Sequence, residues 1–127
     1  IDDRCGIPEM IFKGTLEHFS EDKLARFRRR MCGSSGQTEE FLSHTPTRTA
    51  EELREELAAL ALGITAYGSS SFIWDRAIIG NRDKIFPPRN QHEAWQGTEI
   101  METEAEHYET SLFSRLLEGK GEEWTRH

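Results

Sequence analysis

Residues 49–67 constrain the fold of this chain most, because a helix-start signal is followed there by apolar residues at helical spacing. Thr49 and Glu52 match the capping box, in which each side chain accepts a hydrogen bond from the other residue's backbone N–H. At about 100° per residue, the following apolar residues form one stripe: Leu53, Leu57, Leu60, Ile64 and Tyr67. We therefore predict a central helix over residues 50–67 that becomes buried towards its C-terminal end.

Helical periodicity also marks two other long segments. Ser20 is a typical N-cap residue, and Leu24, Phe27 and Met31 follow it on one helical face, which predicts a helix over residues 20–31. A second apolar stripe consists of Met101, Ala105, Tyr108, Leu112 and Leu116. This stripe predicts a helix over residues 98–118. A shorter helix is expected over residues 37–43.

The segment over residues 72–79 permits two interpretations. Its aromatic and β-branched residues favour a strand, whereas the serines before it and Gly80 after it are typical of the ends of a short helix. We expect the helix, and residues 87–97 should form a surface connection after the extended Phe86-Pro87 step. The chain should then be mostly α, a compact bundle of four to five helices. A small two-stranded element near residues 72–86, with residues 84–86 as the second strand, is the alternative.

The length of 127 residues suits a single domain. We divide it into an N-terminal arm or lead-in segment (residues 1–19), a helical core (residues 20–118) and a polar C-terminal tail (residues 119–127). No stretch approaches the ~20 apolar residues of a membrane-spanning helix. The first residue is Ile, so the chain is a processed form or a piece of a longer protein. A cytoplasmic location is slightly favoured, where Cys5 and Cys32 would remain two thiols, but one disulfide between them is the alternative. Their pairing and the oligomeric state are left open.

Charge is distributed unevenly along the chain. The formal net charge of −7 argues against a general nucleic-acid binder, which needs a basic surface. Residues 90–114 nevertheless hold six Glu and no Lys or Arg, whereas residues 23–30 are strongly basic. The molecule should therefore be dipolar.

The acidic side of the expected helix over residues 98–118 carries the leading functional hypothesis. Apolar residues continue that side, and apolar anchors beside a charged rim are typical of interface hot spots. The predicted partner-binding residues are Glu102, Glu106, Glu109, Phe113, Leu117 and Trp124. We predict a non-enzymatic interaction or regulatory domain that binds another protein, with a basic surface on that partner and without a cofactor.

Two weaker arrangements point to an enzyme. Glu104 and His107 have the Glu-x-x-His spacing of a metal site on one helix, although a helical wheel turns His107 away from the apolar stripe. His92 beside Glu93 resembles a general base with its orienting carboxylate, but the sequence places no nucleophile near them. The chain has no G-x-S-x-G segment and no glycine-rich nucleotide loop.

A basic run at the end of the helix over residues 20–31 supports a further alternative. It consists of Arg26, Arg28, Arg29 and Arg30. Guanidinium groups bind phosphates and carboxylates through paired donors, so this run predicts an RNA- or phosphate-binding surface. Cations also stabilise the negative end of a helix dipole, which explains the same residues without a ligand.

Overall fold

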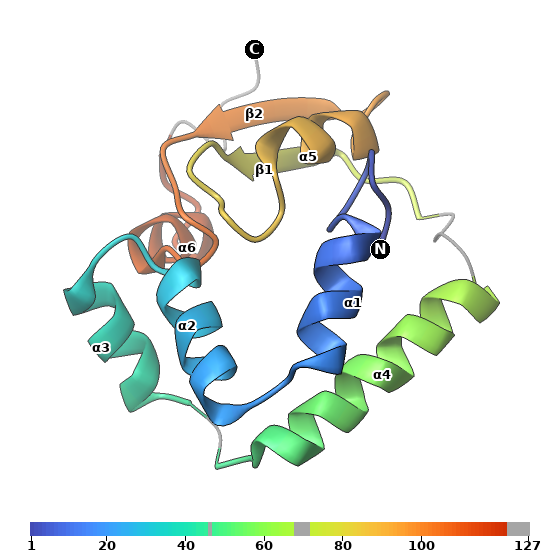
Figure 1. Ribbon diagram of the computed structural model, residues 1–127. Helices are drawn as coiled ribbons and strands as arrows, with labels where there is room; N and C mark the ends of the chain where they lie inside the picture. The colour runs from blue at the N-terminus through green and yellow to red at the C-terminus, as the bar shows by residue number, and fades with distance from the viewer. Residues whose placement is uncertain (46, 68–71, 122–127) are drawn as a thin grey trace.

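The structure, a computed structural model, describes residues 1–45, 47–67 and 72–121, and six helices and two strands lie within those ranges (Figure 1). In chain order the elements are α1 (Glu9–Glu17), α2 (Glu21–Met31), α3 (Ser35–Ser43), α4 (Ala50–Tyr67), β1 (Arg76–Gly80), α5 (Pro88–Ala94), β2 (Glu99–Thr103) and α6 (Thr110–Leu117). The prediction of a mostly α-helical fold is confirmed, with six helices instead of four to five.

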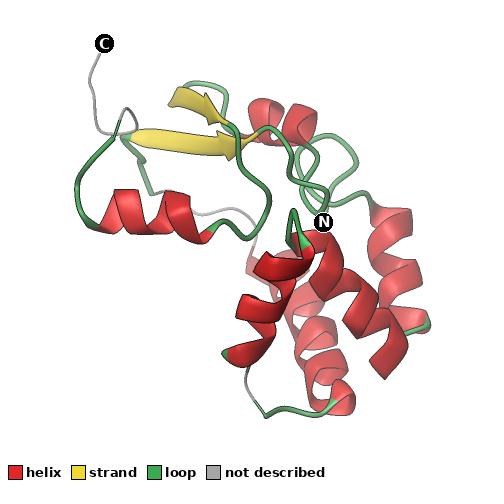
Figure 2. Cartoon of the chain, turned by 90° about the vertical axis from the view of Figure 1, so that its left-hand side faces the viewer, coloured by secondary structure: helices red, strands yellow, loops and turns green. Residues whose placement is uncertain are grey.

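The elements form two groups. Helices α1 to α4 lie together on one side, and the sheet lies on the other side with α5 and α6 (Figures 1 and 2). Helix α1 falls in the segment that we expected to be an arm, and it packs against α4. Among the described residues, the buried apolar side chains are Leu24, Cys32, Ala77, Ile79, Ile85, Ala105 and Leu112. Five of these seven lie in β1 or after it, so the core is centred on the sheet group.

Two helix-start signals in the sequence are confirmed at atomic level. The Ser20 hydroxyl accepts a hydrogen bond from the Lys23 N–H at the start of α2. At the start of α4, the Thr49 N–H donates to Glu52 Oε2 over 2.8 Å, and the Glu52 N–H donates to Thr49 Oγ1 over 3.2 Å. Each bond satisfies a backbone group that the first helical turn leaves without a partner.

Helix α4 is not the buried central helix that its composition predicts. Leu60, Leu62 and Ile64 keep 55%, 74% and 49% of their surface exposed. Apolar residues surround the C-terminal half of α4. Helix α1 packs against one side of α4, so apolar residues on the other sides stay exposed. The prediction of increasing burial towards the C-terminal end is therefore wrong for the described part of the helix.

The second group contains the largest errors of the sequence analysis. Residues 76–80 form a strand, not part of a short helix, and the expected surface connection contains α5. The expected helix over residues 98–118 is also wrong, because it is divided into β2, a loop over residues 104–109 and the shorter α6. Hydrogen bonding between β1 and β2 overrides the local helical pattern, as tertiary context often does.

The two strands pair in parallel, with Arg76 opposite Glu99 and Gly80 opposite Thr103. A two-stranded element therefore exists, but the partner of β1 is β2 and not residues 84–86. Parallel strands need a crossover connection, and α5 lies within it. The carboxyl ends of β1 and β2 consequently meet at the same edge of the sheet.

Two other expectations concern single features of the chain. Cys5 is exposed and Cys32 is buried, and both are free thiols in the structure. Within the three described ranges, no helix has the length and apolar character needed to cross a membrane. The division into arm, core and tail stays a prediction.

The capping box should contribute measurably to stability. Thr49→Ala removes the hydroxyl that caps the Glu52 N–H, and the free energy of unfolding in urea should fall by about 1 kcal/mol. Thr65 is a matched control because it lies on an exposed part of α4, where its hydroxyl donates to the Ala61 carbonyl. Thr65→Ala should leave stability unchanged or slightly higher, since Ala is the better helix former. Equal losses in both variants would contradict the capping role.

Candidate active site

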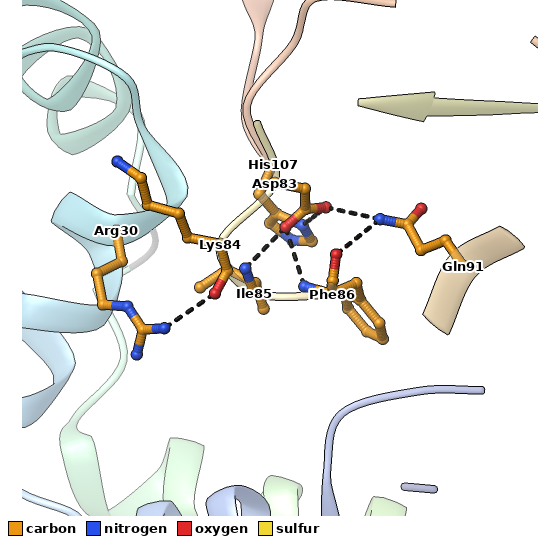
Figure 3. Close-up of polar contacts among 7 residues, drawn as sticks. All are labelled: Arg30, Asp83, Lys84, Ile85, Phe86, Gln91 and His107. Atoms are coloured by element: carbon orange, nitrogen blue, oxygen red, sulfur yellow. Dashed lines mark hydrogen bonds and ion pairs between the residues drawn. The ribbon is translucent and has the colours of Figure 1, made fainter. Parts of the chain in front are cut away.

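Asp83 and His107 come together at the carboxyl edge of the sheet. Asp83 lies three residues after β1 and His107 four residues after β2, so parallel pairing carries both into one place. His107 Nδ1 lies 3.0 Å from Asp83 Oδ2 (Figure 3). The Asp83 side chain is 9% exposed and that of His107 is 29% exposed. This is a carboxylate–imidazole pair, largely buried on its carboxylate side.

Backbone and side-chain donors surround the Asp83 carboxylate. Its Oδ1 accepts hydrogen bonds from the N–H groups of Ile85 and Phe86, over 2.8 and 2.9 Å, and its Oδ2 accepts a longer one from Gln91 (Figure 3). Burial by itself raises the pKa of Asp83, but the hydrogen bonds from His107, Phe86 and Ile85 and the attraction to His107 outweigh it. The pKa of Asp83 therefore lies below its ordinary value of 3.8.

Phe86 and Gln91 hold the pair in place from one side. The Phe86 ring stacks on the His107 imidazole, with ring centroids 5.6 Å apart and an interplanar angle of 20°. Gln91, on α5, donates both to the Phe86 carbonyl over 2.8 Å and to Asp83. The orientation of the imidazole is therefore fixed by a hydrogen bond in the ring plane and by contact with the ring face.

Main-chain hydrogen bonds join the loop after β1 to the loop after β2. The Asn81 N–H donates to the Thr103 carbonyl, and the Arg82 N–H donates to the Ala105 carbonyl. The loops approach so closely that a Cβ atom at Gly80 would lie 2.5 Å from the Ala105 carbonyl oxygen. Glycine at position 80 therefore permits the contact that brings Asp83 and His107 within hydrogen-bond distance.

An apolar cavity of about 290 Å³ adjoins the Asp83 loop. Helices α1, α2 and α4 provide most of its wall, with side chains that include Ile11, Phe12, Leu24, Phe27, Leu53 and Leu57. Lys84 and Ile85, which directly follow Asp83, also line it. The cavity thus extends from the helical group to the loop that carries the carboxylate, and its walls suit an apolar chain.

The Glu104-x-x-His107 pair does not have the predicted geometry. Both residues lie in a loop, and Glu104 is exposed and faces Arg82 at 3.9 Å. His107 instead contacts Asp83, so the expectation of an imidazole turned away from the protein interior is also wrong. Among the residues that the structure describes, no three His, Cys, Asp or Glu side chains gather as a metal site.

His92 and Glu93 do not form the imagined base and orienting carboxylate. His92 Nε2 lies 2.8 Å from Glu102 Oε2, across from α5 to β2, whereas Glu93 pairs with Arg4. The His92 and Glu102 side chains are both nearly half exposed. This second His–carboxylate pair is therefore a surface contact, in contrast to the enclosed Asp83–His107 pair.

The predicted partner-binding residues do not share one helical face. Glu102 lies in β2, Glu106 in the loop and Glu109 at the start of α6, and the Glu106 side chain is only 9% exposed. Phe113 and Leu117 lie on α6 and are exposed, whereas Trp124 is outside the described residues. Partner binding by this set stays a prediction, but the single acidic helix on which it was based is absent.

The basic run lies at the C-terminal end of α2, as predicted. Arg26 and Arg29 are exposed and Arg28 is half-buried. Arg30 turns towards the second group of elements, where its guanidinium donates to the Lys84 carbonyl over 2.9 Å. Phosphate or RNA binding by these residues stays a prediction.

Asp83 is the residue of this candidate site that the sequence analysis missed. Its position shortly after the strand-like residues 72–79 could have indicated a site, because ligand sites of parallel sheets lie beyond the carboxyl ends of the strands. That signal needs a second parallel strand, and the helix assigned to residues 98–118 concealed it.

A solved structure resembles most of the fold of this chain. The crystal structure of BioG from Haemophilus influenzae superposes with a TM-score of 0.79 at 39% sequence identity, over 88% of this chain and 53% of that one. A curated relative from Haemophilus influenzae is 41% identical over 115 residues, 89% of this chain and 53% of the relative. The chain therefore spans about half the length of these relatives.

A relative from Bacteroides fragilis is named malonyl-[acyl-carrier protein] O-methyltransferase. It is 45% identical over 119 residues, which make up 92% of this chain but 24% of the relative. Most of that protein consequently lies outside the matched segment.

The family comparison overturns the leading functional hypothesis. The family model for BioG, described as a pimeloyl-ACP methyl esterase (ACP, acyl-carrier protein), matches residues 1–118. The prediction of a non-enzymatic, regulatory interaction domain is therefore wrong, because almost the whole chain matches a family described by an enzymatic activity. The chain belongs to the BioG family of pimeloyl-ACP methyl esterases.

Proposed function

We propose that this chain supplies the acid–base residue of an ester-hydrolase active site, His107, and the carboxylate that orients it, Asp83. The observation that carries the proposal is the 3.0 Å contact between His107 Nδ1 and a carboxylate that is itself held by two backbone N–H groups. In serine hydrolases an aspartate in this position fixes the imidazole tautomer and stabilises the imidazolium that forms during the reaction.

The proposed reaction assigns one task to each nitrogen of His107. With Nδ1–H donating to Asp83, Nε2 is the nitrogen that accepts the proton of a nucleophilic hydroxyl as its oxygen attacks the ester carbonyl. The protonated imidazole then gives that proton to the departing alcohol. Water next attacks the acyl-enzyme with His107 again as base, which releases the carboxylic acid and restores the hydroxyl.

The nucleophile is proposed to come from the part of the family's proteins that this chain does not cover. In α/β-hydrolases the order along the chain is serine, aspartate, histidine, and Asp83 precedes His107 as this order requires. The present sequence has no G-x-S-x-G segment for a nucleophile elbow. The matched segment is 53% of the solved relative, which leaves room for the remaining catalytic residue.

The apolar cavity supports an acyl substrate. Its lining from α1, α2 and α4 is completed by Lys84 and Ile85, the two residues after Asp83, so an acyl chain in the cavity would lie against the loop that carries the carboxylate. The family description contains acyl-carrier protein, as does the name of the Bacteroides fragilis relative. We therefore propose an ester of an acyl chain carried by ACP as the substrate, with ACP as the protein partner.

Methyl transfer is the less favoured activity for this segment. The name methyltransferase belongs to a protein of which the matched segment is 24%. The family description that matches residues 1–118 is an esterase. The enclosed Asp–His pair also supports hydrolysis, because it is the acid–base arrangement of hydrolases.

Substitution of either member of the pair should abolish ester hydrolysis. The test protein joins this chain to the part of the Haemophilus influenzae relative that the chain does not cover, and release of methanol from pimeloyl-ACP methyl ester is measured. Asp83→Asn should lower kcat about 10⁴-fold because it leaves His107 in the wrong tautomer, and His107→Ala should lower it at least as much.

The exposed His92–Glu102 pair provides the matched control. His92 lies 2.8 Å from the Glu102 carboxylate, a distance similar to that between His107 and Asp83, but this pair is outside the enclosed site. His92→Gln should therefore change kcat less than about twofold. Retention of activity by His107→Ala, with loss in His92→Gln, would reject the assignment.

The ionised state that this role requires should appear in the pH dependence of stability. Because the pKa of Asp83 is lowered by folding, its carboxylate stabilises the folded chain above the ordinary value of 3.8. That contribution is lost as the pH falls below 3.8 through the folded-state pKa. Urea unfolding between about pH 6 and about pH 3 should therefore show a steeper loss of stability for the wild type than for Asp83→Asn. Parallel curves would count against a charged, hydrogen-bonded Asp83.

A further inference from the structure

We propose that the C-terminal end of α2 positions both catalytic loops at once, with Arg30 and Gly33 as its positioning residues. This inference rests on the proposed roles of Asp83 and His107. It concerns two residues for which we propose no contact with the reacting atoms, and it links the cavity wall to the geometry of the pair. We call residues 30–33, which form the last turn of α2 and its exit, the α2 clamp.

The first contact of the α2 clamp is with the aspartate loop. The Arg30 guanidinium donates to the Lys84 carbonyl over 2.9 Å, and Lys84 directly follows Asp83 (Figure 3). The next two residues, Ile85 and Phe86, donate their N–H groups to the Asp83 carboxylate. The donor from α2 therefore holds a four-residue turn whose other polar groups orient the catalytic carboxylate.

The second contact is with the histidine loop. The Met31 carbonyl accepts a hydrogen bond from the Tyr108 N–H over 2.8 Å, and Tyr108 directly follows His107. One helical end thus holds the residue after each member of the catalytic pair. These contacts use adjacent residues of α2, so a shift of this end would move both loops.

The third contact is the close packing of the Glu106 side chain against Gly33. A Cβ atom at position 33 would lie 2.7 Å from Glu106 Cγ, so only glycine fits without displacement of that side chain. The Glu106 side chain is 9% exposed, and its Oε2 has no hydrogen-bond partner among the described residues. Glu106 directly precedes His107, so its close packing against Gly33 limits movement of the loop that carries the imidazole.

Helix α2 also forms one wall of the apolar cavity. Lys23, Leu24, Phe27 and Arg30 line it. Arg30 therefore belongs both to the cavity wall and to the contact with the aspartate loop. A ligand that presses α2 against the loops would favour the aligned arrangement of Asp83 and His107, whereas loosening of α2 would weaken it.

Kinetics of Arg30 variants separate positioning from substrate binding. In the joined protein described above, Arg30→Ala should lower kcat by about 10- to 100-fold, because misplacement of the pair by about 1 Å costs that much. Any rise in KM from its place in the cavity wall should be smaller than this fall in kcat. Arg30→Lys keeps a donor within reach of the Lys84 carbonyl and should recover most of the activity. The exposed Arg29 is the matched control, since Arg29→Ala also removes one cation from the last turn of α2.

Two results for Arg30 would overturn the proposal. A raised KM with unchanged kcat would make Arg30 a substrate-binding residue, and unchanged values of both would leave it without a role. A spectroscopic measurement adds a readout that does not need turnover. In the NMR spectrum of this chain, the Nδ1–H proton of His107 should give a downfield signal that broadens or shifts in Arg30→Ala and stays in place in Arg29→Ala.

Glycine variants provide a second test if Arg30→Ala does not fold. Gly33→Ala should push Glu106 away and lower kcat by about tenfold, again with a change in the His107 signal. Gly36→Ala is the matched control, because the nearest atom to its added Cβ would be Ser34 Oγ at 3.9 Å. Equal behaviour of the two glycine variants would contradict the positioning role of Gly33.

The two measurements distinguish failure of this inference from failure of the proposed function. If the joined wild-type protein does not hydrolyse the ester, the proposed function fails. The His107 signal in the chain alone still reports whether the α2 clamp sets the Asp83–His107 hydrogen bond. If hydrolysis is found but neither kcat nor the signal depends on positions 30 and 33, only the further inference fails.

Discussion

The parallel pairing of β1 with β2 is the interaction on which the rest of this structure depends. Asp83 and His107 are 24 residues apart in sequence, and neither belongs to a regular element. They meet because parallel strands end at the same edge, and because the loops after those strands are joined by main-chain hydrogen bonds. An antiparallel arrangement of the same strands would place the two loops at opposite ends of the sheet.

The site also shows how a carboxylate can be enclosed and remain charged. Removal of Asp83 from water favours its neutral form, but two backbone N–H groups and His107 favour the ionised form more strongly. The backbone donors come from the residues directly after it, in the turn whose Lys84 carbonyl is bonded to Arg30. The imidazole depends on β2, on Phe86 and, in our proposal, on α2. Two hydrogen bonds to the Asp83 carboxylate thus come from its own turn, whereas the imidazole is held by tertiary contacts.

Sequence patterns predicted this protein well wherever the deciding contacts were local. The capping box at Thr49 and the N-cap at Ser20 each involve residues three positions apart, and both were found correctly. The strand β2 was missed because residues 99–103 share a helical stripe with α6, and only the hydrogen bonds to β1 decide between the two structures. His107 was named only as a weak metal-ligand candidate with Glu104, and its neighbour Asp83 could not be seen without the sheet.

In the function that we propose, the two groups of elements divide the requirements of catalysis between them. The helical group would provide apolar surface for a substrate chain, and the sheet would provide the frame for proton transfer. Lys84 and Ile85 belong to the cavity wall and also to the turn that holds the Asp83 carboxylate. A shift of the helices therefore cannot leave the aspartate loop unaffected, since the Lys84 carbonyl is bonded to Arg30. This shared segment is the physical reason to expect that occupancy of the cavity and alignment of the catalytic pair are coupled.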